Sequence, residues 1–134
     1  MYSRFNFRLF DKKEKTMKGA EGVYRYSDFS TKGGEVFPEG VNTSLYFPEE
    51  AILMQCTGLR DKNGKLIFEG DIVHKKGAKN YKGEKMLARI IFSNDTASFN
   101  YSDENGSHDF RNGTSLKMEI LGNIYENPEL LKGD

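Results

Sequence analysis

The chain has 134 residues, with 20 Lys and Arg, 20 Asp and Glu, one Cys and no Trp. A chain of this length folds as one domain and buries about two-thirds of its surface without needing disulfides or metals. Zero formal net charge excludes a protein whose overall field holds it on nucleic acid or an anionic membrane. One Cys cannot form an internal disulfide, and no segment reaches the roughly 18 apolar residues of a membrane span. We therefore expect a single cytoplasmic domain, residues 1–134, with no membrane segment.

The N-terminal part combines one clear strand signal with a glycine-rich stretch. Apolar and polar side chains alternate from Arg4 to Phe10, which predicts a half-buried strand with Arg8 on its polar face. The charged run from Asp11 to Lys15 ends this strand as an exposed turn. Five glycines lie between Gly19 and Gly40 around a short apolar cluster at Val23 to Tyr26. This composition indicates a loop-rich excursion with one weak strand.

The rest of the chain alternates short apolar runs with tight turns. Its three Asn-Gly pairs supply residues that accept the positive φ angles of hairpin turns. Ile52 to Met54 can end a short helix or begin a strand, and Gly70 marks a turn or bulge. The turn pairs are Asn63-Gly64, Asn105-Gly106 and Asn112-Gly113, and the expected strands are Leu66–Phe68, Ile72–Val73, Met86–Phe92, Ala97–Ser102, His108–Phe110 and Leu116–Ile120. This pattern predicts an antiparallel meander.

The C-terminus carries a short helix signal. Asn127 is a suitable cap, and Pro128 suits the first helical position, so a turn or two of helix is expected as far as Leu131. Short β segments joined by tight turns at this chain length favour a small barrel or sandwich. The predicted fold class is mainly β.

Three segments carry a family resemblance. They are RFNFRLFDKKEKTM (Arg4 to Met17), LMQCTGLRDKNGKLIFEGDIV (Leu53 to Val73) and EILGNIYENPELL (Glu119 to Leu131). With these segments the chain resembles the YopX family of phage and prophage proteins. The segments lie near the start, middle and end of the chain, so the resemblance spans the whole domain.

The resemblance implies a more specific architecture. It implies an antiparallel meander closing into a small SH3-like barrel over residues 53–134, preceded by a β-rich extension over residues 1–52. It also implies a phage or prophage origin, and it brings no catalytic residues and no defined activity. The sequence departs from the family pattern at Cys56, where an aromatic residue is more usual, and between Gly19 and Gly40.

Two groups of residues could carry chemistry, and each has a structural alternative. Cys56 could act as a nucleophile with His74 or His108 as its base, or join them in a metal site, but no pair has ligand spacing. The alternative is a small buried thiol. The acids of Glu69-Gly70-Asp71 could bind a metal, or they could solvate a turn built on the glycine. No complete catalytic motif is present, so we expect no enzymatic activity, no resident metal and no cofactor.

Charge placement is the most informative feature. Residues 72–92 carry a net charge of +5, and residues 93–134 carry −5. The lysine-rich segment from Lys75 to Lys85 could contact phosphates as a flexible loop while its tyrosine stacks on a base. Lysine without arginine favours contact with the backbone over reading of bases. The candidate contact residues are Lys75, Lys76, Lys79, Tyr81, Lys82 and Lys85. The alternative is a solvated hairpin, or a charged segment that protects a sheet edge.

The same asymmetry supports self-association. In a closed homo-oligomer, the basic segment of one subunit could face the acidic C-terminal region of the next. Aromatic residues make up 13% of the chain, and some of them could lie in an interface. The leading functional hypothesis is therefore a phage-encoded accessory protein that acts by binding and self-association in the bacterial cytoplasm. Its partners are further copies of itself, nucleic acid, or a host or phage protein, and the second hypothesis is a nucleic-acid-binding module.

Overall fold

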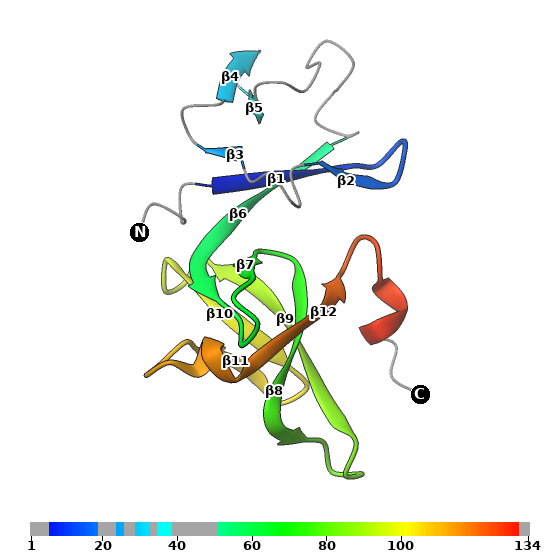
Figure 1. The fold of residues 1–134 in the computed structure, drawn as a ribbon, viewed down its shortest axis with the longest axis vertical. Helices are drawn as coiled ribbons and strands as arrows, with labels where there is room; N and C mark the ends of the chain where they lie inside the picture. The colour runs from blue at the N-terminus through cyan, green and yellow to red at the C-terminus, as the bar shows by residue number, and fades with distance from the viewer. Residues whose placement is uncertain (1–5, 19–23, 26–28, 33–34, 39–50, 132–134) are drawn as a thin grey trace.

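The computed structural model describes residues 6–18, 24–25, 29–32, 35–38 and 51–131. Within this part of the chain most residues form strands, every strand pair is antiparallel, and no helix reaches seven residues (Figure 1). The mainly β prediction is confirmed. No helix among the described residues is long and apolar enough to cross a membrane. Arg4, and most of the stretch from Gly19 to Gly40, lie outside the described residues.

The N-terminal sheet is built around β1 (Asn6–Asp11). Its hydrogen-bonded order is β2-β1-β6-β7, and β3 also pairs with β1. The segment from Ile52 to Met54, whose sequence fits either a helix end or a strand start, is part of a strand that runs antiparallel to β1. The other elements are β2 (Thr16–Lys18), β3 (Tyr24–Arg25), β6 (Ala51–Arg60) and β7 (Leu66–Phe68), while β4 (Phe29–Lys32) and β5 (Glu35–Pro38) form a separate pair.

Strand β1 is buried on both faces. Leu9 is fully buried, as its alternation with polar residues predicts, but Arg8 on the opposite face is also only 6% exposed. The prediction of a half-buried strand with a polar outer face is therefore wrong at Arg8. The reason is a long-range ion pair with Asp71, because a paired charge can be buried where a single charge cannot.

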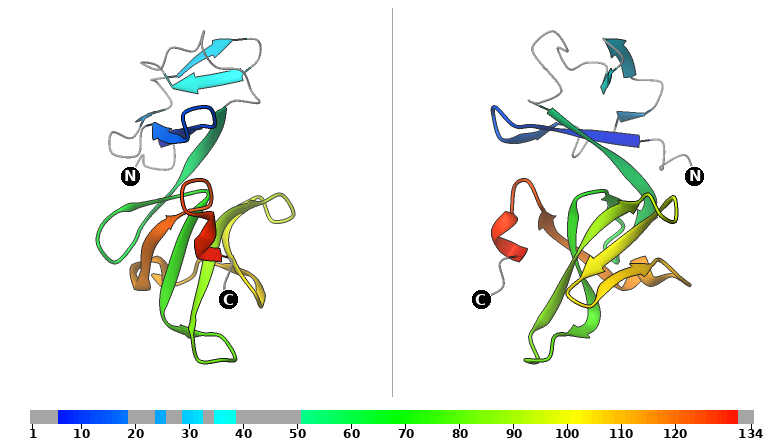
Figure 2. Two further views of the ribbon diagram at one scale, coloured as in Figure 1. Left: turned by 90° about the vertical axis from the view of Figure 1, so that its right-hand side faces the viewer. Right: turned by 180° about the vertical axis from the view of Figure 1, so that it is seen from behind.

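The second sheet is a five-stranded antiparallel meander in the order β11-β10-β9-β8-β12. It curls into a half-barrel, and β7 and the end of β6 lie beside it (Figure 2). The predicted turns at Asn63-Gly64 and Asn105-Gly106 separate adjacent strands, and Gly64 (φ 81°) and Gly106 (φ 117°) have the expected positive φ. The strands are β8 (Asp71–Lys79), β9 (Lys85–Ser93), β10 (Ser98–Asp103), β11 (Gly106–Asp109) and β12 (Met118–Asn123).

Two short 3-10 helices lie in the described C-terminal part of the chain. The first, η5 (Thr114–Lys117), replaces the start of the strand predicted from Leu116, because Gly113 is left-handed (φ 76°) and turns the chain before β12 begins. The second, η6 (Pro128–Leu131), is the predicted C-terminal helical turn. The side-chain oxygen of Asn127 accepts the backbone N–H of Asn123 at 3.1 Å and so braces the turn before the helix.

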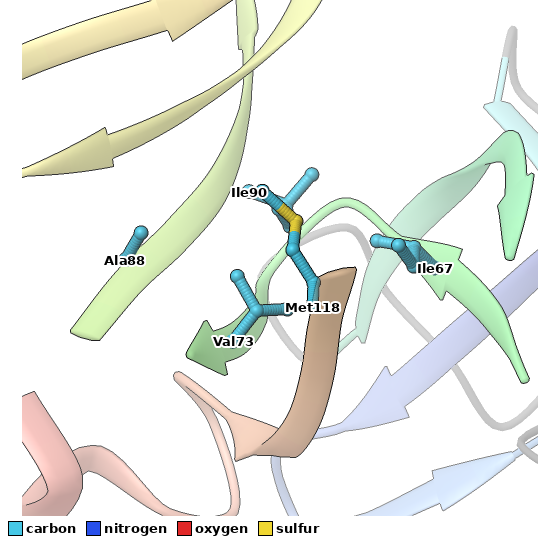
Figure 3. Close-up of a cluster of buried hydrophobic side chains, with 5 residues drawn as sticks. All are labelled: Ile67, Val73, Ala88, Ile90 and Met118. Atoms are coloured by element: carbon cyan, nitrogen blue, oxygen red, sulfur yellow. The ribbon is translucent and has the colours of Figure 1, made fainter. Parts of the chain in front are cut away.

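The curled sheet closes over a compact apolar core (Figure 3). Four strands contribute to it, and every member is less than 10% exposed. The members are Ile67 from β7, Val73 from β8, Ala88 and Ile90 from β9, and Met118 from β12. This core holds together the strands that frame the candidate site.

Candidate nucleic-acid interface

A two-stranded hairpin projects from the curled sheet (Figure 1). Strand β12 pairs with β8 only as far as Lys75, and β10 pairs with β9 only as far as Arg89. Beyond those points, β8 and β9 pair only with each other among the described strands. We call residues 75–85 the basic arm; it contains five lysines and one acid. The predicted flexible loop is therefore mostly strand, and only its tip, residues 80–84, is a turn.

Hydrogen bonds fix the tip of the basic arm. The side-chain oxygen of Asn80 accepts the backbone N–H groups of Lys82 (2.9 Å) and Glu84 (3.0 Å). The backbone N–H of Asn80 also donates to the carbonyl of Glu84, and Gly83 supplies a positive φ of 80°. An isolated two-stranded hairpin has marginal stability in water. The hydrogen bonds of the Asn80 side chain therefore help to hold the tip in this conformation. The turn presents Tyr81, which is 88% exposed.

A bulge bends β8 at the base of the basic arm. The strand register with β9 shifts between His74 and Lys79, and Gly77 in this interval has φ 84°. A ring nitrogen of His74 lies 3.1 Å from the carbonyl oxygen of Ala78, so this contact joins the two ends of the bulge. Bulges bend a strand and re-aim its side chains. Two residues of the bulge, Lys76 and Gly77, line a groove beside it.

The groove beside the bulge has a volume of about 920 Å³ and is strongly basic. Four lysines line it against a single acid, and that acid already pairs with one of the lysines, because Lys62 Nζ lies 3.6 Å from Glu119 Oε1. We call it the basic groove. Its lining residues are Lys62, His74, Lys76, Gly77, Lys85, Leu116, Lys117 and Glu119.

A buried aspartate brings Lys62 to the basic groove. Asp61 is only 1% exposed, and its carboxylate accepts backbone N–H groups of its own turn and, at 3.1 Å, that of Ile120 in β12. The N–H of Lys62 then donates to the carbonyl of Met118 at 2.8 Å. These bonds tie the turn between β6 and β7 to β12. Helix η5 places Leu116, 62% exposed, and Lys117 on the same side.

The structure places five of the six predicted contact residues in two sets, and the sixth, Lys75, in neither. Lys76 and Lys85 line the basic groove, while Lys79, Tyr81 and Lys82 lie at the outer end of the basic arm. Lys75 is half-buried opposite Met118. Sequence reasoning missed two groove residues, Lys62 and Lys117. The one available signal was the position of Lys62 in an Asn-Gly turn, where lysine is exposed.

Cys56 lies away from this surface and is fully buried. Burial raises the pKa of its thiol, and a protonated thiol is a poor nucleophile. Within the described part of the chain, no three His, Cys, Asp or Glu side chains gather in an arrangement that could hold a metal ion. The geometry therefore favours the structural role for Cys56.

Glu69-Gly70-Asp71 forms a structural junction between the two sheets. Asp71 pairs with Arg8 of β1 at 2.8 Å and accepts the backbone N–H of Phe68 at 2.8 Å. Burial raises the pKa of the Asp71 carboxyl, and the neighbouring guanidinium opposes that rise. Gly70 has φ 91°, as the turn interpretation requires, and a Cβ there would lie 3.2 Å from the sulfur of Met54. These contacts favour the turn interpretation of the acid pair.

Opposite charges also meet within one subunit. A second groove has a volume of about 490 Å³. It is lined by Lys85 and Arg89 of β9, and by Asp103 and Glu104 at the end of the neighbouring strand β10. The basic and acidic segments of the sequence are therefore neighbours here. Lys85 lines both grooves, so three lysines of the basic groove, Lys62, Lys76 and Lys117, lie apart from these acids, and the basic groove itself contains one acid, Glu119.

The described residues define a small antiparallel β protein with a curled sheet and a projecting basic hairpin. The chain belongs to the YopX family, whose model, described as YopX protein, matches residues 6–132. This family is not known as a family of enzymes. No curated protein matches the chain.

Two solved structures have the same fold. Protein EF1440 from Enterococcus faecalis is 29% identical in sequence with a TM-score of 0.61, and the match covers 94% of this chain and 96% of that one. Protein yopX from Bacillus subtilis is 20% identical with a TM-score of 0.58, and the match covers 98% of each chain. The chain thus spans nearly the full length of both neighbours.

Proposed function

We propose that this protein is a non-enzymatic accessory protein of a phage or prophage, and that it acts in the bacterial cytoplasm by binding nucleic acid. In this proposal residues 1–134 form one binding module, with an SH3-like barrel over residues 53–134. The contact surface is the basic groove together with the basic arm. The observation that carries the proposal is the basic groove, where four lysines face one acid.

The chemistry of the groove suits a phosphate backbone. Lysine ammonium groups bind phosphates as point charges and do not read base edges in the bidentate manner of arginine. The groove is open and the whole chain is neutral, so binding depends on local charge and is weak at physiological salt. We therefore expect binding that is insensitive to sequence and steeply dependent on salt.

The first prediction concerns the triple variant Lys62→Gln, Lys76→Gln and Lys117→Gln. It should bind a fluorescent single-stranded oligonucleotide more weakly than the unaltered protein at low salt. Each lost phosphate contact lowers the slope of log affinity against log salt by about 0.7 for a single strand, so the slope should fall by about 2. Anisotropy titrations from about 25 to 200 mM salt measure both quantities.

The matched control removes the same charge from another exposed turn. Lys12→Gln, Lys13→Gln and Lys15→Gln lie between β1 and β2, and all three side chains are exposed. This control should keep the affinity and slope of the unaltered protein. The proposal fails if the control loses as much affinity as the groove variant, or if the unaltered protein ignores DNA and RNA even at low salt.

Self-association is a second candidate function, and an exposed aromatic residue favours it. Phe92 on β9 is 42% exposed and packs edge-to-face on Phe99 of β10 at 5.3 Å. An exposed aromatic side chain that packs on a half-buried one is typical of an interface. Light scattering over a hundredfold range of protein concentration should show an oligomer that Phe92→Ser weakens. A monomer at every concentration would rule this candidate out.

A further inference from the structure

We propose that the tip of the basic arm is a stacking platform for an unpaired base, so that the nucleic acid this protein binds is single-stranded. Tyr81 supplies the platform and the lysines around it hold the adjoining phosphates. This inference rests on the proposed function and specifies its ligand.

The exposure of Tyr81 is the first observation. Its side chain is 88% exposed, more than any other large hydrophobic residue of the described part of the chain. It contributes nothing to the core, yet the turn that carries it is fixed by the paired hydrogen bonds of Asn80. A turn whose backbone is already held by hydrogen bonds loses less conformational entropy on binding than an open loop does.

Charges around the ring are the second observation. Lys82 Nζ lies 5.7 Å from the centre of the Tyr81 ring, within the range of a cation–π contact. A cation over one face of the ring leaves the other face available for a base. In this proposal the same ammonium group pairs with the phosphate next to the stacked base.

A like-charge pair across the arm is the third observation. Lys79 and Lys85 are register partners on β8 and β9, directly beside the tip turn. Like charges opposite each other destabilise an antiparallel pair. Asp103 and Glu104 line a groove with Lys85, whereas among the described residues neither acid lines a groove with Lys79. Phosphates bound at the arm would offset the remaining repulsion, so the pair suits a polyanionic ligand.

Stacking on Tyr81 selects the form of the nucleic acid. In a duplex each base already stacks on its neighbours, so only phosphates and groove edges are available to the arm. In a single strand every base has a free face, and aromatic stacking tolerates any base. The geometry therefore favours a single strand held without sequence preference, its backbone on the lysines of the arm and groove.

The decisive variants are Tyr81→Ala and Tyr81→Phe, tested with an oligothymidylate of about 12 nucleotides and with a blunt duplex of similar length. Tyr81→Ala should weaken binding to the single strand by about 5- to 100-fold, the usual range for one stacked base, and leave duplex binding unchanged. Tyr81→Phe keeps the ring and should keep the affinity. Tyr81 is exposed and makes no core contact, so these variants should fold normally.

A spectroscopic readout distinguishes stacking from loss of charge. The chain has no Trp, so Tyr81→Trp introduces a single indole whose fluorescence should be quenched when oligothymidylate binds. If Tyr81→Ala leaves single-strand affinity unchanged while the groove variant weakens it, the platform is wrong and the proposed function stands. If the unaltered protein binds neither the single strand nor the duplex, both the stacking platform and the proposed function are wrong.

Discussion

Replacing Arg8 with Met should lower the free energy of unfolding by about 3–5 kcal/mol at neutral pH, the usual cost of leaving a buried charge without its partner. The side chains of Arg8 and Asp71 are 7% and 2% exposed, and they meet at 2.8 Å between β1 and the start of β8. Without the guanidinium, the carboxylate of Asp71 stays buried and unpaired. Urea denaturation at pH 7 measures the loss.

The loss should depend on pH in a definite direction. Burial already raises the pKa of Asp71 in the native protein, and removing the opposing guanidinium raises it further. A carboxyl whose folded pKa lies above its unfolded pKa stabilises the fold fully below the unfolded value and loses that contribution as pH rises through the folded value. The cost of Arg8→Met relative to the unaltered protein should therefore be smaller in acid than at pH 7.

Two further variants make the interpretation of Arg8→Met secure. Adding Asp71→Asn removes the stranded charge, and the amide oxygen can still accept the backbone N–H of Phe68, so the double variant should recover most of the loss. Arg111→Met breaks an exposed pair with Asp109 at 3.3 Å and should cost under about 1 kcal/mol. If Arg8→Met costs no more than this control, the buried pair does not join the two sheets as described.

Met118→Ala should lower the free energy of unfolding by about 2–5 kcal/mol, the usual range for truncating a buried side chain of this size. Met118 is fully buried where β12 closes over β8 and β9, and it is one of the five members of the apolar cluster shown in Figure 3. Truncation leaves a cavity that the surrounding strands fill only in part. Met118→Leu conserves volume and should cost less than about 1.5 kcal/mol.

Leu116→Ala is the natural control for Met118→Ala, since both residues belong to the run predicted as one alternating strand. Leu116 is 62% exposed in η5, so its truncation should change the free energy of unfolding by less than about 0.5 kcal/mol. Equal losses at the two positions would contradict the observed break between helix and strand.

Local chemistry explains which parts of the fold were predictable. Asn-Gly turns and two-residue alternation depend on neighbouring residues alone, and the hairpin turns at Asn63-Gly64 and Asn105-Gly106 are confirmed. The alternation around Arg8 predicts a polar face, because it contains no information about Asp71, which is distant in sequence. The alternation from Leu116 to Ile120 predicts a strand that begins too early, because the left-handed Gly113 turns the chain without changing that alternation.

The candidate site likewise combines residues that a local pattern predicts with residues that only tertiary contacts bring together. The lysine run and its exposed tyrosine are visible in the sequence, because they are contiguous. Lys62 and Lys117 join the basic groove only through tertiary contacts, in particular the hydrogen bond from the backbone N–H of Ile120 to the carboxylate of Asp61. No local pattern specifies that contact.

Backbone amide NMR during a titration with oligothymidylate tests the account most directly, because it locates the contact surface without altering the protein. At low salt, the largest shifts should occur at Gly77, Tyr81 and Lys117, which lie along the basic arm and the basic groove. Shifts confined to the turn at residues 12–15, or no shifts at all, would contradict it.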